Sequence, residues 1–126
     1  QAQQAAWNKA AFEAKNLDDT VKALGGTSAA QSADISINAP DIAENGAVVP
    51  VTVSTDLADV ESISVIVDNN PTPLAAMFEL SPQSVADVSI RIKMGESSVV
   101  RAVVKAGGKF YSASKEVKVT IGGCGG

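Results

Sequence analysis

The 126-residue chain contains no histidine and only one cysteine, Cys124. Without histidine, Ser-His-Asp and Cys-His catalysis are not available, and histidine-ligated metal sites are excluded. A single cysteine excludes an intramolecular disulfide and a thiolate metal cluster. These absences remove most conventional enzyme chemistry, so we expect this chain to have no catalytic residue, no metal site and no cofactor of its own.

Aromatic residues are scarce, at 4% of the chain, and the net charge is −4, from 14 acidic and 10 basic residues. Nucleic-acid binding needs a basic face for the phosphates, so we expect no nucleic-acid partner. No apolar run approaches the roughly 20 residues that span a bilayer, so we expect no membrane partner. The first residues lack the basic end and apolar stretch of a secretory signal, but an exported chain trimmed of its signal would look the same.

The first 25 residues carry an apolar stripe with spacings of three and four, which predicts helix. Asn16 or Asp18 is suited to cap a second, shorter helix in this segment, and Gly25-Gly26 is suited to end it. We therefore predict a helical N-terminal extension and connector over residues 1–32, packed on the following domain by its stripe. The stripe consists of Trp7, Ala10, Ala11, Ala14, Leu17, Val21 and Leu24.

After residue 32 the apolar period changes to 2, which is typical of half-buried β-strands. Pro50 cannot donate to a ladder, so its strand is expected at an edge or with a bulge. About seven short strands predict a mainly β fold, an immunoglobulin-like antiparallel β-sandwich over residues 33–121, with a closed barrel as the alternative. The predicted strands are Ile35–Ile37, Val49–Val53, Ile63–Val67, Leu74–Leu80, Val88–Ile92, Val99–Val104 and Val117–Ile121.

Two turn segments lie between these strands. Gly107-Gly108 has the spacing of a β-hairpin. The stretch from Asp68 to Pro73 is interpreted as a polar turn stiffened by proline. The alternative for this second segment is a contact surface for a partner.

The most informative segment is the end of the chain, Gly122-Gly123-Cys124-Gly125-Gly126, which holds four of the ten glycines and the only cysteine. A buried cysteine needs neighbours to pack against, and these glycines provide none. Glycines near a terminus also carry a large ordering cost, so residues 122–126 are expected to form a flexible arm. From Gly122 to Cys124 this arm would span about 10 Å at most.

A thiol on such an arm has neither the base nor the oxyanion site that an enzyme nucleophile needs. The arrangement suits a covalent carrier, in which Cys124 holds a substrate while other proteins supply the catalysis. Glycines would make the arm slim enough to enter a narrow active-site channel. An engineered labelling tail is the alternative that the tail alone leaves open.

With the tail and the strands in view, the chain resembles the SoxY family, the sulfur-carrier subunits of the bacterial Sox sulfur-oxidation system. The residues from Gly122 to Gly126 match the signature of that family. Other similar segments extend the resemblance over nearly the whole chain: 39–51, Asn70-Pro71 with Pro73, Trp7 with Phe12, and the 107–111 hairpin.

The resemblance implies a periplasmic, non-catalytic carrier, exported with a cleaved signal and paired with SoxZ, a small all-β subunit. In that family a c-type haem enzyme is thought to conjugate thiosulfate to the cysteine, which gives a cysteine S-thiosulfonate. A manganese-dependent hydrolase then releases sulfate, and a sulfane dehydrogenase oxidises the sulfur that stays behind. The implied attachment residue here is Cys124, and an oxidising compartment would also permit a disulfide dimer through it.

Two hypotheses from other functional classes stay open at this point. The first is a thiol redox relay that cycles through intermolecular disulfides, which the absence of a second, resolving cysteine weakens. The second is a structural β-sandwich interaction module with an incidental tail.

Overall fold

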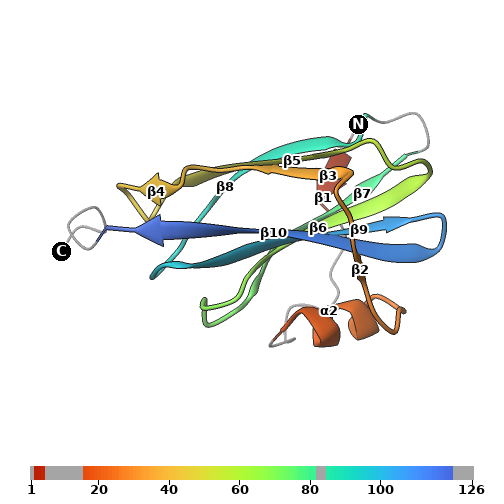
Figure 1. Cartoon of the computed structure of the whole chain (residues 1–126), viewed down its shortest axis with the longest axis horizontal. Coiled ribbons are helices and arrows are strands. Elements are labelled where there is room, and N and C mark those ends of the chain that lie inside the picture. The colour runs from red at the N-terminus through yellow and green to blue at the C-terminus, as the bar shows by residue number, and fades with distance from the viewer. Residues whose placement is uncertain (1, 5–15, 82–84, 121–126) are drawn as a thin grey trace.

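The computed structural model describes residues 2–4, 16–81 and 85–120, which form two β-sheets packed face to face with one helix outside them (Figure 1). The larger sheet has the order β1-β7-β6-β9-β10-β2, with β4 also paired to β10. Its strands are β1 (Ala2–Gln4), β2 (Ala30–Gln31), β4 (Ile42–Ala43), β6 (Val60–Val67), β7 (Leu74–Leu80), β9 (Ser98–Ala106) and β10 (Lys109–Val119).

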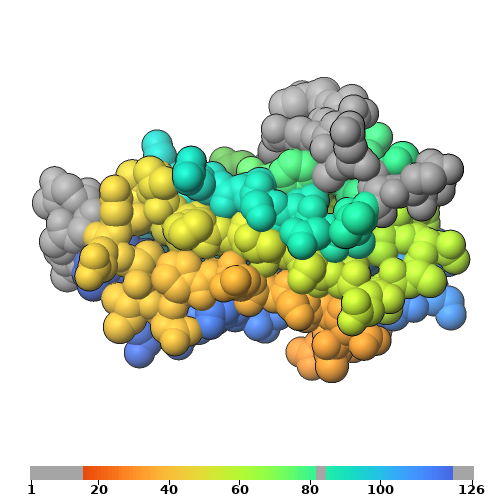
Figure 2. Space-filling model, turned by 90° about the horizontal axis from the view of Figure 1, so that it is seen from above, coloured from red at the N-terminus to blue at the C-terminus, as the bar shows by residue number. Residues whose placement is uncertain are grey.

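The smaller sheet has the order β3-β5-β8 and forms the face shown in Figure 2. Its strands are β3 (Ile35–Asn38), β5 (Val49–Thr55) and β8 (Asp87–Ile92). Each strand predicted from the apolar alternation has a counterpart among the described residues, and the pairing is mostly antiparallel. The last one is present only as far as Val119, the end of β10, and its predicted end at Ile121 lies outside the described residues. The β-sandwich prediction is therefore confirmed, and the described strands do not close into a barrel.

The main core lies between the two sheets and is built almost entirely from aliphatic side chains. Alternate residues of the longer strands point inward, such as Val49, Val51 and Val53 in β5, which are at most 1% exposed. Each fully buried side chain of this size contributes about 1.5–3 kcal/mol relative to an exposed one. The other buried members are Ile35, Ala43, Ile63, Val65, Val67, Val88, Ile92, Met94, Val100, Ala102, Val104, Ala106 and Val117.

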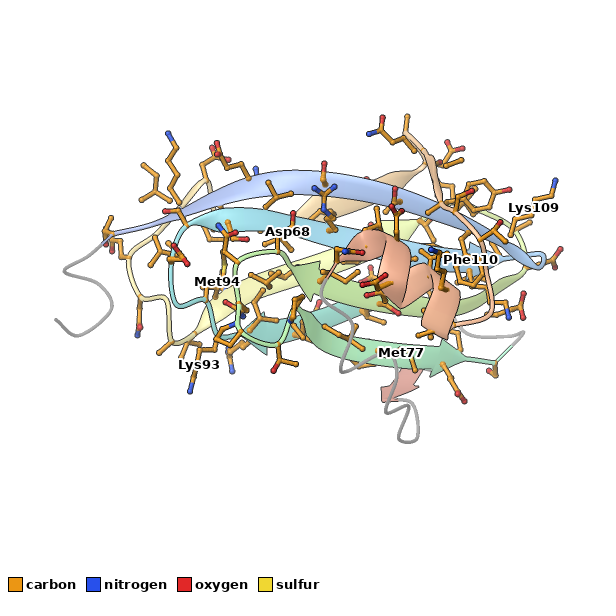
Figure 3. The ribbon with its side chains drawn as sticks, turned by 90° about the horizontal axis from the view of Figure 1, so that it is seen from below. Asp68, Met77, Lys93, Met94, Lys109 and Phe110 are labelled. Atoms are coloured by element: carbon orange, nitrogen blue, oxygen red, sulfur yellow. The ribbon has the colours of Figure 1, made fainter. Side chains whose placement is uncertain are left out.

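A second, smaller core lies on the outer face of the larger sheet, beneath helix α2 (Leu17–Ala23). Val21 of the helix is fully buried and packs with Ile66 and Phe110, and Figure 3 shows Phe110 beside the helix. The sheet is consequently buried on both faces here. This explains why Ile63 to Val67 of β6 form an unbroken buried run instead of the alternation of a half-buried strand.

Helix α2 has the two boundaries that the sequence predicts. Asn16 caps its start, because its Oδ1 accepts the N–H of Asp19 at 2.8 Å. At its end, the N–H of Gly26 donates to the carbonyl of Val21 at 2.9 Å, and Gly25 takes a φ of 96°. This is the left-handed glycine termination expected for Gly25-Gly26.

The helical prediction for the beginning of the chain is wrong at residues 2–4. These residues form β1 and pair antiparallel with the edge of β7, from Ala2 opposite Leu80 to Gln4 opposite Phe78. The apolar stripe starts only at Trp7, so no helical period opposed this pairing at the edge of the sheet. Residues 5–15, which include Trp7 and Phe12, lie outside the described residues. The segment boundaries at residues 32 and 121 stay a prediction.

The expectation for Pro50 is also wrong as stated, because β5 is the central strand of its sheet. Pro50 lies opposite Arg91 of β8, but β3 pairs with β5 only from Thr52 to Thr55. The proline thus precedes the stretch of β5 that has a neighbour on both sides. A central strand tolerates proline where one of its edges is locally uncovered.

The contact between Gly26 and the second core yields a prediction about stability. A Cβ added at Gly26 would lie 2.5 Å from the ring of Phe110 and 2.9 Å from Val21 Cγ1. Since both neighbours are buried, Gly26→Ala is expected to lower the free energy of unfolding by about 1–3 kcal/mol. The matched control is Gly95→Ala, whose Cβ would meet nothing within 4 Å. Denaturant midpoints measure both effects, and equal midpoints for the two variants would contradict the packing described here.

Candidate functional site

The predicted site residues Cys124, Gly122, Gly123, Gly125 and Gly126 lie outside the residues that the structure describes. The described chain ends at Thr120, directly after β10. The geometry of the site is therefore that of Lys118, Val119 and Thr120, which we call the arm root. It lies at one end of the sandwich, beside β4 (Figure 1).

One edge of the arm root is held by β4, which runs parallel to it. The N–H of Lys118 donates to the carbonyl of Asp41 at 3.0 Å, and the N–H of Thr120 donates to the carbonyl of Ala43 at 3.1 Å. Ala43 is itself buried in the main core, at 5% exposure. This edge of the root is thereby tied to the interior of the sandwich.

The opposite edge of the arm root is held by a side chain. The antiparallel pairing of β10 with β9 runs from Lys109 to Val117, whose partner is Ser98. Beyond that point the N–H of Val119 donates to Oγ of Ser97 at 2.8 Å. Successive N–H groups of a strand point to opposite edges, so the root is bonded on both sides up to its last residues.

An exposed ion pair connects Lys115 of β10 with Asp41, the residue directly before β4. Nζ of Lys115 donates to Oδ1 of Asp41 at 2.6 Å, and this hydrogen bond, together with the charge of Lys115, lowers the pKa of Asp41 below its ordinary value of 3.8. A lowered carboxyl pKa means that the pair is present above that ordinary pKa and is lost as the pH falls through the lowered value. Asp41 is largely exposed, so the pair orients β4 without adding much stability.

Within residues 2–4, 16–81 and 85–120, no cluster of three or more His, Cys, Asp or Glu is placed to hold a metal ion. The exposed apolar side chain of Ile42, at 58% exposure, lies in β4 opposite Lys118. In the same described part of the chain, no helix is long and apolar enough to cross a membrane.

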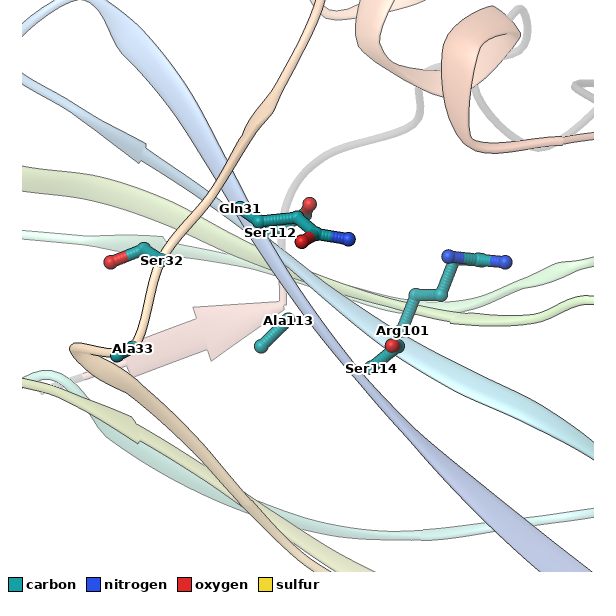
Figure 4. A pocket seen from close by; sticks show the side chains of 7 residues that line it. All are labelled: Gln31, Ser32, Ala33, Arg101, Ser112, Ala113 and Ser114. Carbon is teal, nitrogen blue, oxygen red and sulfur yellow. The ribbon is translucent and has the colours of Figure 1, made fainter.

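The hollow shown in Figure 4 is shallow and lacks a free charge. It has a volume of about 330 Å³ and lies on the larger sheet, lined mainly by small polar side chains with Arg101 at one side. The guanidinium of Arg101 is already paired, because its Nε lies 3.0 and 3.1 Å from the two carboxylate oxygens of Asp68. The hollow therefore has no unpaired cation to offer an anionic ligand.

Sequence reasoning missed the residues that hold the arm root. β4 has two residues, too few for a periodic pattern, and Ser97 stands among turn residues with nothing to mark its bond to Val119. The segment after β6 is a polar turn as predicted, and its Asn69 Nδ2 donates to the carbonyl of Ser97 at 2.9 Å. Its alternative role as a partner surface stays a prediction.

Two comparisons, one with protein-family models and one with solved structures, both match SoxY proteins. The family model of the sulfur oxidation protein SoxY matches residues 21–124. A solved structure of the sulfur carrier protein SoxY from Chlorobium limicola f thiosulfatophilum is 45% identical, with a TM-score of 0.75, over 83% of this chain and 96% of that chain. A search of curated proteins found no match.

Two further solved structures share the fold alone. The superoxide reductase (neelaredoxin) from Ignicoccus hospitalis is 20% identical with a TM-score of 0.60, over 68% of this chain and 80% of that one. A variant of the same reductase is 19% identical with a TM-score of 0.60, over 79% of this chain and 87% of that one.

The family match spans most of the chain and reaches the only cysteine. The chain belongs to the SoxY family of sulfur oxidation proteins.

Proposed function

We propose that this protein is a non-catalytic sulfur carrier of a Sox-type oxidation system, with Cys124 as the covalent attachment residue. The observation that carries this proposal is the family match, which extends through residue 124 and so includes the only thiol of the chain. The relative from Chlorobium limicola is itself described as a sulfur carrier protein. A resolving cysteine, which a redox relay would use, is absent from the sequence.

The proposed loading step joins the Cys124 sulfur to the outer sulfur of thiosulfate. The thiol loses its proton, an S–S bond forms, and two electrons pass to a haem-containing partner enzyme, which leaves a cysteine S-thiosulfonate. Water then attacks the terminal sulfonate on a manganese-dependent partner hydrolase, so that the S–S bond to that group breaks. Sulfate leaves with the oxygen of the water, and a persulfide stays on Cys124 for a partner sulfane dehydrogenase. Persulfides are reversible modifications, so the thiol can be regenerated.

The geometry of the arm root supports a carrier that binds the substrate while partner enzymes supply the catalysis. The described chain is bonded on both edges as far as Val119 and Thr120. The four residues from there to Cys124 allow the thiol a reach of about 14 Å. Glycine has no side chain to obstruct a channel and adopts conformations that other residues avoid. A fixed root with a slim arm would let several enzymes receive the same thiol in turn.

We further propose the periplasm as the compartment and a SoxZ-like small β subunit as a stable partner. Family membership supports both proposals. Exposed apolar side chains on the described surface support a partner, and they are Ile42, Val48 and Val85, at 58%, 47% and 79% exposure.

The carrier role predicts the behaviour of Cys124→Ser. Thiosulfate-dependent turnover in a reconstituted system should be abolished, because serine cannot form the sulfur–sulfur bond. The melting temperature should be unchanged, because the neighbouring glycines give the thiol nothing to pack against. Substantial residual turnover would contradict the proposal.

The slim-arm mechanism predicts a separate effect of bulk at Gly122 and Gly123. Replacing both with valine adds branched side chains and restricts the backbone to extended conformations. Turnover by the partner enzymes should fall more than about tenfold, equivalent to roughly 1.4 kcal/mol of transition-state stabilisation. Alkylation of Cys124 by a small reagent should keep nearly its former rate. Wild-type processing of the double variant would show that the mechanism is wrong.

The partner proposal predicts a stable heterodimer. Sedimentation of the chain mixed with a SoxZ-like subunit should show one species of the combined mass, whether or not reductant is present. A homodimer linked through Cys124 would instead disappear when reductant is added. A monodisperse monomer that ignores the small β subunit would contradict the heterodimer.

A further inference from the structure

We infer that Ser97 and Asn69 are positioning residues of the carrier: together they hold the backbone of Val119 and so fix the direction in which the arm leaves the sandwich. This inference rests on the proposed carrier function and deepens it. It also gives a role to the polar turn after β6. The sequence alone allowed two interpretations of this segment, a plain turn or a contact surface for a partner.

The first step of the argument concerns the edge of β10. Its ladder with β9 ends at Val117 opposite Ser98, two residues before Val119. The N–H of Val119 faces that same edge and has no backbone partner there among the described residues. Oγ of Ser97 lies 2.8 Å from it, so one side chain extends the ladder by a further bond. Without the hydroxyl, the N–H of Val119 would hydrogen-bond to water, and only the pairing with β4 would hold the arm root.

The second step concerns what holds Ser97, which is exposed and lies in the turn between β8 and β9. Nδ2 of Asn69 donates to the Ser97 carbonyl at 2.9 Å, and the N–H of Asn69 donates to Oγ of Ser98 at 3.0 Å. The other end of the same turn is bound by Asn70, whose Nδ2 donates to the carbonyl of Lys93 at 2.6 Å. Two successive asparagines thus fix the turn that presents the Ser97 hydroxyl.

The third step links the root to delivery of the thiol. Val119 lies three residues before Gly122 and five before Cys124. A change of direction at the root displaces the whole arm, whereas a change within the arm displaces only its end. A group on a flexible tether reacts at a rate that depends on its effective concentration at the reacting centre, and the point and direction from which the tether starts affect that concentration. Loss of the Ser97 bond is therefore expected to slow processing of the thiol without changing its reactivity.

The test compares Ser97→Ala with Ser97→Thr, which keeps the hydroxyl, and with Ser89→Ala as a matched control. Ser89 is also exposed and makes one hydroxyl hydrogen bond, at 2.9 Å to Thr52, on the smaller sheet. Amide hydrogen exchange at Val119 and kcat/KM for conjugation of thiosulfate by the partner enzyme are measured on the full chain. Alkylation of Cys124 by a small reagent is measured in parallel.

In Ser97→Ala, we expect exchange at Val119 to accelerate and kcat/KM to fall, each about three- to tenfold, the range for one lost hydrogen bond. Ser97→Thr and Ser89→Ala should match the wild type, and the alkylation rate should be the same in all four proteins. Asn69→Leu, which removes the Nδ2 donor with an uncharged side chain of similar size, should have a smaller effect of the same kind and serves also if Ser97→Ala does not fold.

Two results would overturn the inference. Unchanged exchange at Val119 in Ser97→Ala would show that the hydroxyl does not hold the root. Accelerated exchange with an unchanged kcat/KM would show that the root does not govern delivery. Failure of the proposed function is distinguishable, because the wild-type chain would then acquire no sulfur adduct at Cys124, whereas the exchange at Val119 would still report on Ser97.

Discussion

The structure depends on the backbone pairing of β10. Over nine positions this strand pairs with β9, from Lys109 to Val117, and it contributes Val117 to the main core and Phe110 to the core beneath α2. On its other edge it pairs with β2 and β4. A strand that contributes to both cores therefore also ends at the arm root. Any force applied to the arm acts on a strand that is paired along both of its edges.

Much of this fold follows from local sequence patterns. Valine and isoleucine at every second position determine the strands, because β-branched side chains suit a pleated surface with one buried face. Asn16 and Gly25-Gly26 determine both ends of α2 by local hydrogen bonding and backbone conformation. The exceptions depend on neighbours distant in sequence. Residues 2–4 form a strand only because the edge of β7 is available. Pro50 is accepted because the pairing of β5 with β3 covers only Thr52 to Thr55.

In the candidate site, too, one part is predictable from local sequence and another part depends on residues distant in sequence. The sequence predicts Cys124 as the attachment residue, because it is the only thiol of the chain and lies among glycines. The arm root was not predictable, since β4 is too short to produce a period and the Ser97–Val119 bond joins residues 22 positions apart. The sequence around Asn69 predicts a polar turn. It does not predict that Asn69 binds the carbonyl of Ser97, because the pairing of β6 with β9 is what brings these two turns together. Local patterns thus predict the reactive residue, and the tertiary structure supplies the contacts that we propose direct it.

The proposed carrier function requires that sulfur is bound covalently at Cys124 and nowhere else in the chain. Its most direct test is tandem mass spectrometry of the C-terminal peptide, isolated without reductant from protein exposed to thiosulfate and the conjugating partner. The account predicts adducts of thiosulfate and of single sulfur atoms on the Cys124 peptide, all removed by reductant. Unmodified Cys124 in protein that is turning over thiosulfate would contradict it.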